Sequence, residues 1–501
     1  MATRAEQLPY GIGRWSAGWT VVLVILLAVI AVGVYGYSQQ LTLGEVVTGL
    51  RDIGTMGGAP WGLYVSFVVY FVGVSFAGIT VAAMIRLFGL KHLKPIARMA
   101  EVLTVIALIL GAFVIIADVG QPVRAIVNLL RYARPGSPFF GTFTLVISGY
   151  LFGSLVYLYL DGRRDAALLA KQPGRLRGFY RIWAAGYRGT PTEREHHSRA
   201  SFWLAIAILP LLVTAHSTLG FVFGLQVGRP GWFSGLQAPG FVALAGVSGV
   251  GLLIIIAAVV RRALGTQDQL GKDIFRWLGG LLLVLTLAYL YFMSVDLLTS
   301  TYAATTHEAS ISNALLRGEY AWLYWGVVAG LFVSVSVLAI QFIPALENLR
   351  LPAAWPRIAL VVGVATFLIA LLVLSQIIPA IKQIGLVLAP QAMIVLTGLL
   401  AILVIAFWVT LLPLLRGRPI AAAVIAGVLV NLAAIGKRYL IVVPSQTHGT
   451  LLPYSAGSYS PTWVEYSVIL ALFALGMLLF ILFMKVFPIM EVEDGARLQG
   501  G

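Results

Sequence analysis

An aspartate and an arginine that directly follow an apolar run are the first residues of this sequence that could do chemistry. The run VLTVIALILGAFVII is followed by ADVGQPVRAIVNLLRYARPGSP, so Asp118 stands at the mouth of a membrane-length segment and Arg124 lies six residues later. A carboxylate is costly at this position, so it usually has a partner or a function. We expect Asp118 to have a function or to be buried with a partner, and Arg124 is the obvious candidate for that partner.

Other ionisable residues lie in or beside apolar segments and could belong to the same site, which would handle protons, a polar head group, or both. These candidates are Asp296, His307, Lys437, Arg438 and His448. Plainer roles remain open for them. The two histidines could be solvated loop residues, and Lys437 and Arg438 could be anchors or form salt bridges. The same holds for Arg131 and Arg134, which could extend to the membrane surface as interfacial anchors.

The elements that hold these residues must be membrane helices. Of the 501 residues 60% are hydrophobic and only 11% are charged, and the mean hydropathy is +0.94. A soluble domain has about 25% charged residues. The sequence therefore predicts an all-α, multi-pass membrane protein. The net charge of +15 then reflects the basic loops on the inner side of the membrane, and we expect no nucleic-acid partner.

Runs of about 20 apolar residues are long enough to cross the bilayer, and the sequence contains about twelve. They are expected at 18–38, 60–85, 99–117, 139–160, 200–226, 239–260, 277–299, 320–346, 358–380, 390–415, 419–436 and 464–484. The first run is too long for a signal peptide. The pair 358–380 and 390–415 contains prolines and Lys382 and could be partly re-entrant, which would leave ten spans.

The distribution of lysine and arginine predicts the orientation. With the N-terminus inside, 25 of the 34 basic residues fall on the inner side and 9 on the outer side. This bias predicts that both termini are cytoplasmic and that the Asp118 site lies at the outer face. We expect the protein in the inner (cytoplasmic) membrane of the cell. The chain divides into spans 1–4 (1–160), a basic cytoplasmic loop (161–199), spans 5–11 (200–436), an outer loop (437–463) and the last span with its tail (464–501).

Composition argues against several cofactors and activities on this chain. It has no cysteine, so an iron–sulfur cluster or a cysteine-bound zinc would have to lie on a partner. Of six histidines only His216 lies within a span, which cannot ligate a bis-histidine haem, so we expect no haem and a hydrogen-bonded packing role for His216. The phosphate-binding, zinc-protease and serine-hydrolase motifs are also missing, and we expect no metal site.

Two segments carry a resemblance to a known family. The stretch from APWGLYVSFVVYFVGVSFAGITVAAMIRLFG to SPFFGTF resembles the polysulfide reductase NrfD-type membrane subunits. The family pattern of Trp-Gly, small residues and Asp-x-Gly-x-Pro-x-Arg is matched by Trp61, Gly62, Gly73, Ser75, Gly78, Asp118, Gly120, Pro122 and Arg124. Gln121 departs from the family's usual basic residue. GKRYLIVVPSQTH and the last span are similar to longer members, such as hydrogenase membrane subunits and the quinol-oxidising subunit of alternative complex III.

This resemblance implies NrfD-like four-helix bundles and a haem-free, quinone-binding subunit that is not catalytic alone. Such subunits exchange electrons between the quinone pool (menaquinone or ubiquinone) and a ferredoxin-type iron–sulfur subunit on the outer face. A molybdopterin, hydrogenase or multihaem cytochrome subunit would complete the respiratory complex. Asp118 and Arg124 would then be catalytic, and Trp61, Tyr64 and Gln121 would join the residues above around the quinone. The two aromatic residues could instead belong to an interfacial belt.

Three further expectations remain open. Protons could also reach the cytoplasm through polar residues in the spans, for which Glu101, Asp296, Gln341 and Asn431 are candidates. A secondary transporter is a competing class, because twelve spans with both termini inside are common in transporters. A purely structural anchor of a redox complex is the third reading, and it would not need Asp118.

Overall fold

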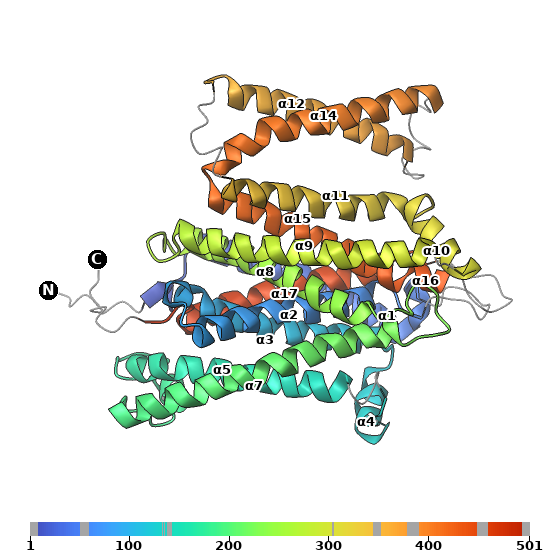
Figure 1. The fold of residues 1–501 in the computed structure, drawn as a ribbon. Helices are drawn as coiled ribbons and strands as arrows, with labels where there is room; N and C mark the ends of the chain where they lie inside the picture. Colours follow the sequence, from blue (N-terminus) through green and yellow to red (C-terminus); the bar gives the residue numbers. More distant parts are fainter. Residues whose placement is uncertain are drawn as a thin grey trace.

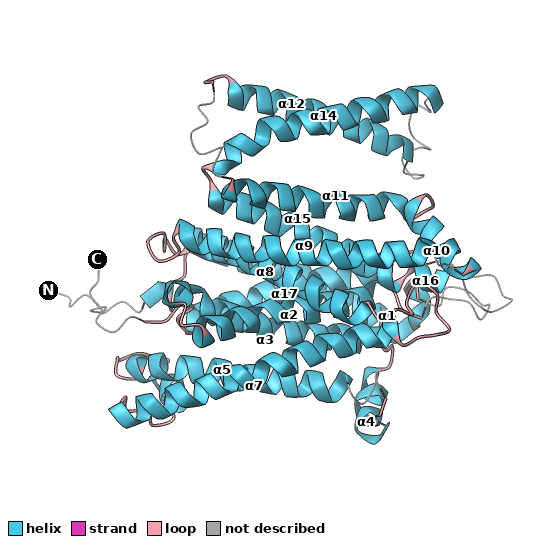
Figure 2. Ribbon diagram, viewed as in Figure 1, coloured by secondary structure: helices cyan, strands magenta, loops and turns pink. Residues whose placement is uncertain are grey.

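The computed structural model describes residues 9–50, 60–132, 134, 136–137, 143–302, 305–343, 352–377, 390–447 and 459–492. Every regular element in these ranges is a helix (Figure 2). The longer helices are α1 (Ala17–Leu43), α2 (Leu63–Leu87), α3 (Lys94–Asp118), α5 (Phe143–Leu169), α7 (Pro191–Gly224), α8 (Gln237–Ala263), α9 (Lys272–Tyr302), α11 (Ala321–Ala339), α12 (Trp355–Ile377), α14 (Pro390–Arg416), α15 (Pro419–Val442) and α17 (Trp463–Val486). The shorter ones are α4 (Pro122–Tyr132), α6 (Arg177–Ala184), α10 (Thr306–Leu316) and α16 (Pro444–Thr447), with 3-10 turns η1 (Pro9–Gly11), η2 (Glu45–Val47), η3 (Lys91–Leu93) and η5 (Ile340–Phe342).

The twelve longer helices are the membrane spans. Each is long and apolar enough to cross a bilayer, which confirms the all-α fold and the expected number of twelve. The pair α12 and α14, which the sequence left open as partly re-entrant, consists of two such helices. The helices lie side by side in layers (Figure 1). The start of α1 and the end of α17 lie at one end of this bundle, and α10 and α16 lie at the other, which we call the outer end after the predicted orientation.

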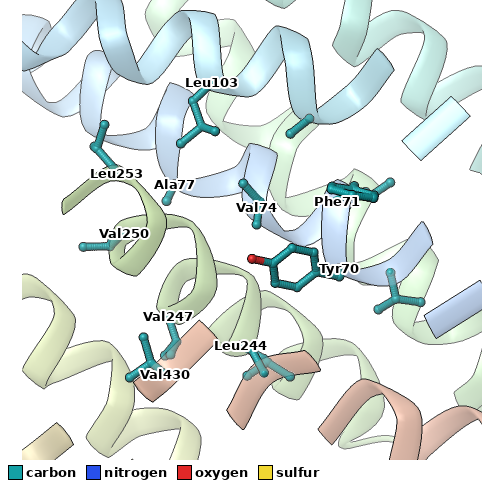
Figure 3. Close-up of a cluster of buried hydrophobic side chains, with 14 of the residues drawn as sticks. Tyr70, Phe71, Val74, Ala77, Leu103, Leu244, Val247, Val250, Leu253 and Val430 are labelled. Carbon is teal, nitrogen blue, oxygen red and sulfur yellow. The ribbon is translucent and has the colours of Figure 1, made fainter. Parts of the chain in front are cut away.

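Helix α2 forms the centre of the bundle. It packs against α3, α7, α8 and α15, and nearly all its residues are buried. Figure 3 shows one side of this core, where Tyr70, Val74 and Ala77 of α2 face valines and leucines of α8, with Leu103 of α3 and Val430 of α15 beside them. Because lipid tails are as apolar as these side chains, close packing and polar contacts must hold such helices together.

A buried ion-pair network closes the inner end of the bundle. Arg98 of α3 is 1% exposed and bonds the carboxylates of Asp161 at 3.0 Å and Asp165 at 2.7 Å, both on α5. Its Nη1 also donates to the carbonyl oxygens of Pro488 and Met490, just after α17. One fully partnered arginine therefore joins α3, α5 and the segment that follows the last span.

Candidate functional site

Asp118 is the last residue of α3 and is half-buried at the outer end of the bundle. A turn follows it in which Gly120 has a φ of +66°, a left-handed conformation that favours glycine. This turn packs against Glu45, because a Cβ atom on Gly120 would overlap with the Glu45 carboxylate. The Asp118 turn therefore brings a second acidic side chain into the same site.

The polar residues around Asp118 come from three helices and the η2 turn, and we call Gln40, Glu45, Tyr64 and Asp118 the outer cluster. The fully buried Tyr64 hydroxyl donates to Gln40 Oε1 at 2.9 Å. Gln40 Nε2 donates to the carbonyl oxygen of Ala117 at 2.8 Å and to Glu45 Oε1 at 3.1 Å. The charges of Glu45 and Asp118 both act on Tyr64. In the outer cluster the Gln40 amide thus links the Glu45 carboxylate to the buried Tyr64 phenol, beside the end of α3 that carries Asp118.

Glu465, at the start of α17, borders the outer cluster but has a structural role. Its carboxylate accepts hydrogen bonds from the Tyr459 hydroxyl at 2.5 Å and from the backbone amides of Gly49 and Thr462 at 2.8 and 3.0 Å. The Tyr459 hydroxyl also accepts a bond from the Leu63 amide. Burial and the neighbouring Glu465 carboxylate raise the pKa of Tyr459, so its hydroxyl stays protonated as a donor.

Trp61, just before α2, belongs to an aromatic group with residues from the α7–α8 region. Its ring stacks on Trp232 at 5.5 Å and meets Phe223 edge to face at 5.8 Å. The side-chain amide of Gln446 bonds both the Trp61 amide and its carbonyl oxygen, at 3.1 and 2.7 Å. These contacts hold the entry to α2 in place.

The remaining candidates from the outer loops are not part of the outer cluster. Gln121 and Arg124 are exposed, Arg124 on the short helix α4, whose N-terminus follows the Asp118 turn. His307 is half-buried in α10, where the neighbouring Glu308 forms a capping box with Thr305. His448 lies outside the described residues.

Arg438 occupies a second polar region, at the middle of the bundle. It is 1% exposed, donates to Ser248 Oγ at 3.1 Å and lies over the ring of Tyr70 at 5.4 Å. A Cβ atom on Gly73 would overlap with Arg438 Nη2, so this glycine gives the guanidinium its place against α2. No described atom is a hydrogen-bond partner for its Nε and Nη1.

Two cavities lie next to Arg438, and together we call them the chamber. One is bordered by Arg438, Gly73 and His216. The other is bordered by Asp296, Lys437 and Tyr289. Three apolar residues line both, so the cavities are neighbours: Phe241, Leu244 and Ile441. The chamber brings Asp296, Lys437 and Arg438 together, apart from the outer cluster.

The other polar residues in the spans are mostly satisfied by their neighbours. His216 is buried, with Nδ1 and Nε2 each 2.8 Å from a carbonyl oxygen, those of Leu212 and Val72, which confirms a hydrogen-bonded packing residue. Asn431 accepts from the Tyr70 hydroxyl at 2.9 Å. Gln341 donates to the Leu415 carbonyl at the inner end, away from the chamber.

Glu101 differs from these residues. It is 1% exposed, yet neither of its carboxylate oxygens has a hydrogen-bond partner among the described residues. It lies one turn of α3 from the Arg98 network, and the charges of Asp161, Arg86 and Arg98 act on it. Glu101 is therefore a buried titratable group in the inner half of the bundle.

The sequence did not single out four residues of these regions: Gln40, Glu45, Tyr70 and Tyr459. Gln40 and Glu45 lie at and just beyond the end of the first span, where polar residues are ordinary, so position alone does not distinguish them. Tyr70 and Tyr459 resemble other membrane tyrosines in the sequence. Only the packing of α1, α2, α3, α15 and α17 gives these side chains their partners.

Comparisons with known proteins agree with this architecture. Residues 52–385 match the family model described as polysulphide reductase, NrfD. A Halobacterium salinarum protein, provisionally named as a membrane subunit of dimethyl sulfoxide reductase, is 32% identical over 320 residues, 63% of this chain and 68% of the relative. A selenate reductase subunit of Mesobacillus selenatarsenatis is 26% identical over 350 residues, 68% and 78% of the two chains.

A third relative is named as a subunit of a menaquinol oxidoreductase. The Hdr-like menaquinol oxidoreductase integral membrane subunit of Archaeoglobus fulgidus is 24% identical over 319 residues, 63% of this chain and 70% of the relative. The family match covers more than half of the chain and includes the Asp118 turn and the central helix α2. This multi-pass membrane protein therefore belongs to the polysulphide reductase NrfD family.

Proposed function

We propose that this chain is the haem-free membrane subunit of a respiratory oxidoreductase and exchanges electrons between the quinone pool and an iron–sulfur subunit at its outer end. The names of the relatives support the class, since they include subunits of two reductases and of a menaquinol oxidoreductase. The chain has no cysteine, so the clusters that take or give electrons would belong to a ferredoxin-type partner subunit. A molybdopterin, hydrogenase or multihaem cytochrome subunit would complete the complex.

The outer cluster is the observation that carries this proposal. Oxidation of a menaquinol or ubiquinol gives the quinone, two electrons and two protons, so the two hydroxyl groups need proton acceptors within hydrogen-bond reach. Asp118 and Glu45 are two carboxylates at one site, and the Gln40 amide links Glu45 to the Tyr64 hydroxyl. The apolar ring would pack on the aromatic residues around Trp61.

The two predicted catalytic residues, Asp118 and Arg124, differ in exposure, and we assign them different roles. Half-buried Asp118 accepts a proton from the quinol, and the position of the cluster at the outer end directs that proton outward. Arg124 is exposed on α4, so its cation faces the outer surface, where it would attract an acidic patch of the iron–sulfur subunit.

The variant Asp118→Asn tests the proton-acceptor role. The amide keeps the shape of the side chain but cannot accept a proton at neutral pH. We expect quinol oxidation by the purified complex to fall by about 100-fold or more, the range of general-base catalysis, while the partner subunits still co-purify. Asp273→Asn is the matched control, because Asp273 is an exposed aspartate in the first turn of α9 at the inner end.

The hypothesis of a purely structural anchor predicts that Asp118→Asn does not change quinol oxidation. If Asp118→Asn assembles and turns over quinol at the wild-type rate, the proton-acceptor role is wrong and the anchor is favoured. The secondary transporter would instead purify without a redox partner. Iron analysis and an optical redox spectrum of the co-purifying subunits distinguish these outcomes.

A further inference from the structure

Arg438 is a fixed cation near the middle of the membrane. Gly73, which its guanidinium touches, lies ten residues into α2, about 15 Å from the outer end at 1.5 Å per residue, and the apolar bilayer core is about 30 Å thick. No carboxylate of the described residues forms an ion pair with Arg438. An arginine side chain does not lose its charge in proteins. The charge of Arg438 is therefore not neutralised by the surrounding helices.

The unpartnered groups of this cation border the chamber. Arg438 Nε and Nη1 are buried without a partner among the described residues, and burying a charged donor without a hydrogen bond is costly. The space open to the centres of water molecules is about 10 Å³ in the inner cavity and about 30 Å³ in the outer one. About 10–15 Å³ of such space is enough for one water. A short file of water in the chamber satisfies these donors, and Asp296 and Lys437 supply further polar contacts along the wall.

The chamber extends along α8 from the outer end to Arg438. Its outer cavity is bordered by Leu236 and Gln237, at the start of α8, and by half-buried Asp296. Its inner cavity ends at Gly73, His216 and Arg438. The two are neighbours along one face of α8. The charged groups that line this route are Asp296, Lys437 and Arg438, and only the first is acidic.

Polar groups continue on the inner side of Arg438. Its hydrogen-bond partner is Ser248 on α8. On α2, two residues beyond Gly73, the Ser75 carbonyl accepts hydrogen bonds from the Thr104 and Tyr150 hydroxyls. Glu101, one turn before Thr104 on α3, carries the unpartnered buried carboxyl group. Arg438 thus stands between a chamber reached from the outer end and a proton-binding group in the inner half.

We propose that the chamber is a water-filled compartment that opens at the outer end, and that the Arg438 guanidinium closes it to protons. A fixed cation in a narrow, low-dielectric passage repels hydronium and other cations, so water enters but protons do not cross to Glu101. The benefit to the cell rests on the proposed function. Protons released outside from quinol conserve energy only if they do not flow back through the subunit.

Hydroxyl-radical labelling of the wild-type full-length chain in ¹⁸O-water tests for the water. Tyr289 lines the chamber, and we expect it to incorporate ¹⁸O severalfold faster than Tyr150 and Tyr157, which are also buried but border neither cavity. Equal labelling of Tyr289 and Tyr150 would overturn the water-filled chamber. This measurement needs no variant, so it does not depend on the folding of a mutant.

Proton flux into liposomes tests the barrier. Full-length chain is reconstituted with an internal pH dye, and a potassium gradient with valinomycin drives proton entry. We expect Arg438→Met to raise the leak by about tenfold or more, because the repulsive charge is gone, and Arg438→Lys to stay near the wild-type rate. Arg317→Met, an exposed arginine at the outer end, is the matched control.

One result would overturn the proton barrier. It is an Arg438→Met protein that is monodisperse, keeps the wild-type melting temperature and lets protons through no faster than wild type. A leak of the same size in Arg317→Met would also overturn it, since the effect would not belong to the chamber. Neither assay contains quinone or partner subunits. Failure of the quinol-oxidation experiment on Asp118 and failure of the barrier are therefore separate outcomes.

Discussion

At the scale of single residues, two arginines of this protein are buried, which costs free energy for a charged side chain. They differ in the partners that surround the guanidinium. Arg98 at the inner end has two carboxylates and two carbonyl oxygens around its guanidinium. Arg438 has a serine hydroxyl and a tyrosine ring as partners and borders a cavity, and its Nε and Nη1 have no partner among the described residues. A complete set of partners is typical of an arginine that stabilises the fold. Missing protein partners beside a cavity indicate an arginine kept for a function.

The variant Arg98→Gln tests the first of these roles. It leaves Asp161 and Asp165 buried without their cation, and removing one partner of a buried pair costs about 3–5 kcal/mol. We expect a marked fall in the melting temperature followed by tryptophan fluorescence in detergent. Arg199→Gln is the control, because its ion pair with Glu195 is exposed and is worth at most about 1 kcal/mol. Equal melting of both variants would contradict the structural role of Arg98.

The neighbours of Asp118 show what a local sequence signal can and cannot predict. Asp118 is conspicuous because an apolar run directly precedes it, and its predicted partner Arg124 is close in the sequence. The structure also brings Glu45 of η2 and Tyr64 of α2 to the same region, and the sequence did not predict Glu45 there. Contacts between residues so far apart in the chain depend on helix packing, which hydrophobic pattern alone does not specify.

At the scale of helices, small residues decide how closely neighbours approach. Helix α1 is largely exposed to lipid and packs mainly on α17. A Cβ atom on Gly33 would overlap with Ala471 and lie 2.7 Å from the Ser467 carbonyl oxygen. Gly36 touches Ser467 one turn later. This close contact of glycine with small residues is the usual way in which two membrane helices associate.

Gly33→Val should therefore loosen α1 from α17. The added side chain meets backbone as well as side-chain atoms, and overpacking of this kind costs about 1–3 kcal/mol. We expect a lower melting temperature and faster proteolytic release of the N-terminal segment. Gly18→Ala in the same helix has only Ser16 near the new methyl group, at 3.8 Å, and should behave as wild type. A Gly33→Val protein as stable as wild type would show that α1 tolerates a shift.

The spans were predictable from the sequence, whereas the short helices were not. A run of about 20 apolar residues is recognised by composition alone, and all twelve expected spans correspond to helices. Helix α4 has 11 residues, too few to cross a bilayer. Val123, Ile126 and Val127 are exposed on one face of it, with Arg124 at the edge of that face, a pattern typical of a helix that lies at the membrane surface.

At the scale of the whole molecule, the bundle consists of a body and a hairpin. Helices α12 and α14 pack on each other and stand apart from the other spans at one side of the body (Figure 1). Their contact with the body is concentrated at the inner end, where Leu415 packs with Val337 and Ala422 and its carbonyl accepts a bond from Gln341. The outer cluster, the chamber and the Arg98 network all lie in the body, formed by the other ten spans.

Deletion of residues 352–416 tests whether the body folds and functions by itself. The hairpin leaves the body after η5 and returns at Pro419, both at the inner end, so the remaining chain can connect them. Lipid tails can replace the apolar contacts of Leu415, and the main loss is the hydrogen bond of Gln341, about 1–3 kcal/mol. We expect the ten-span protein to insert, to melt within several degrees of wild type and to keep the ¹⁸O labelling of Tyr289. An aggregated product, or loss of that labelling, would show that the hairpin supports the body.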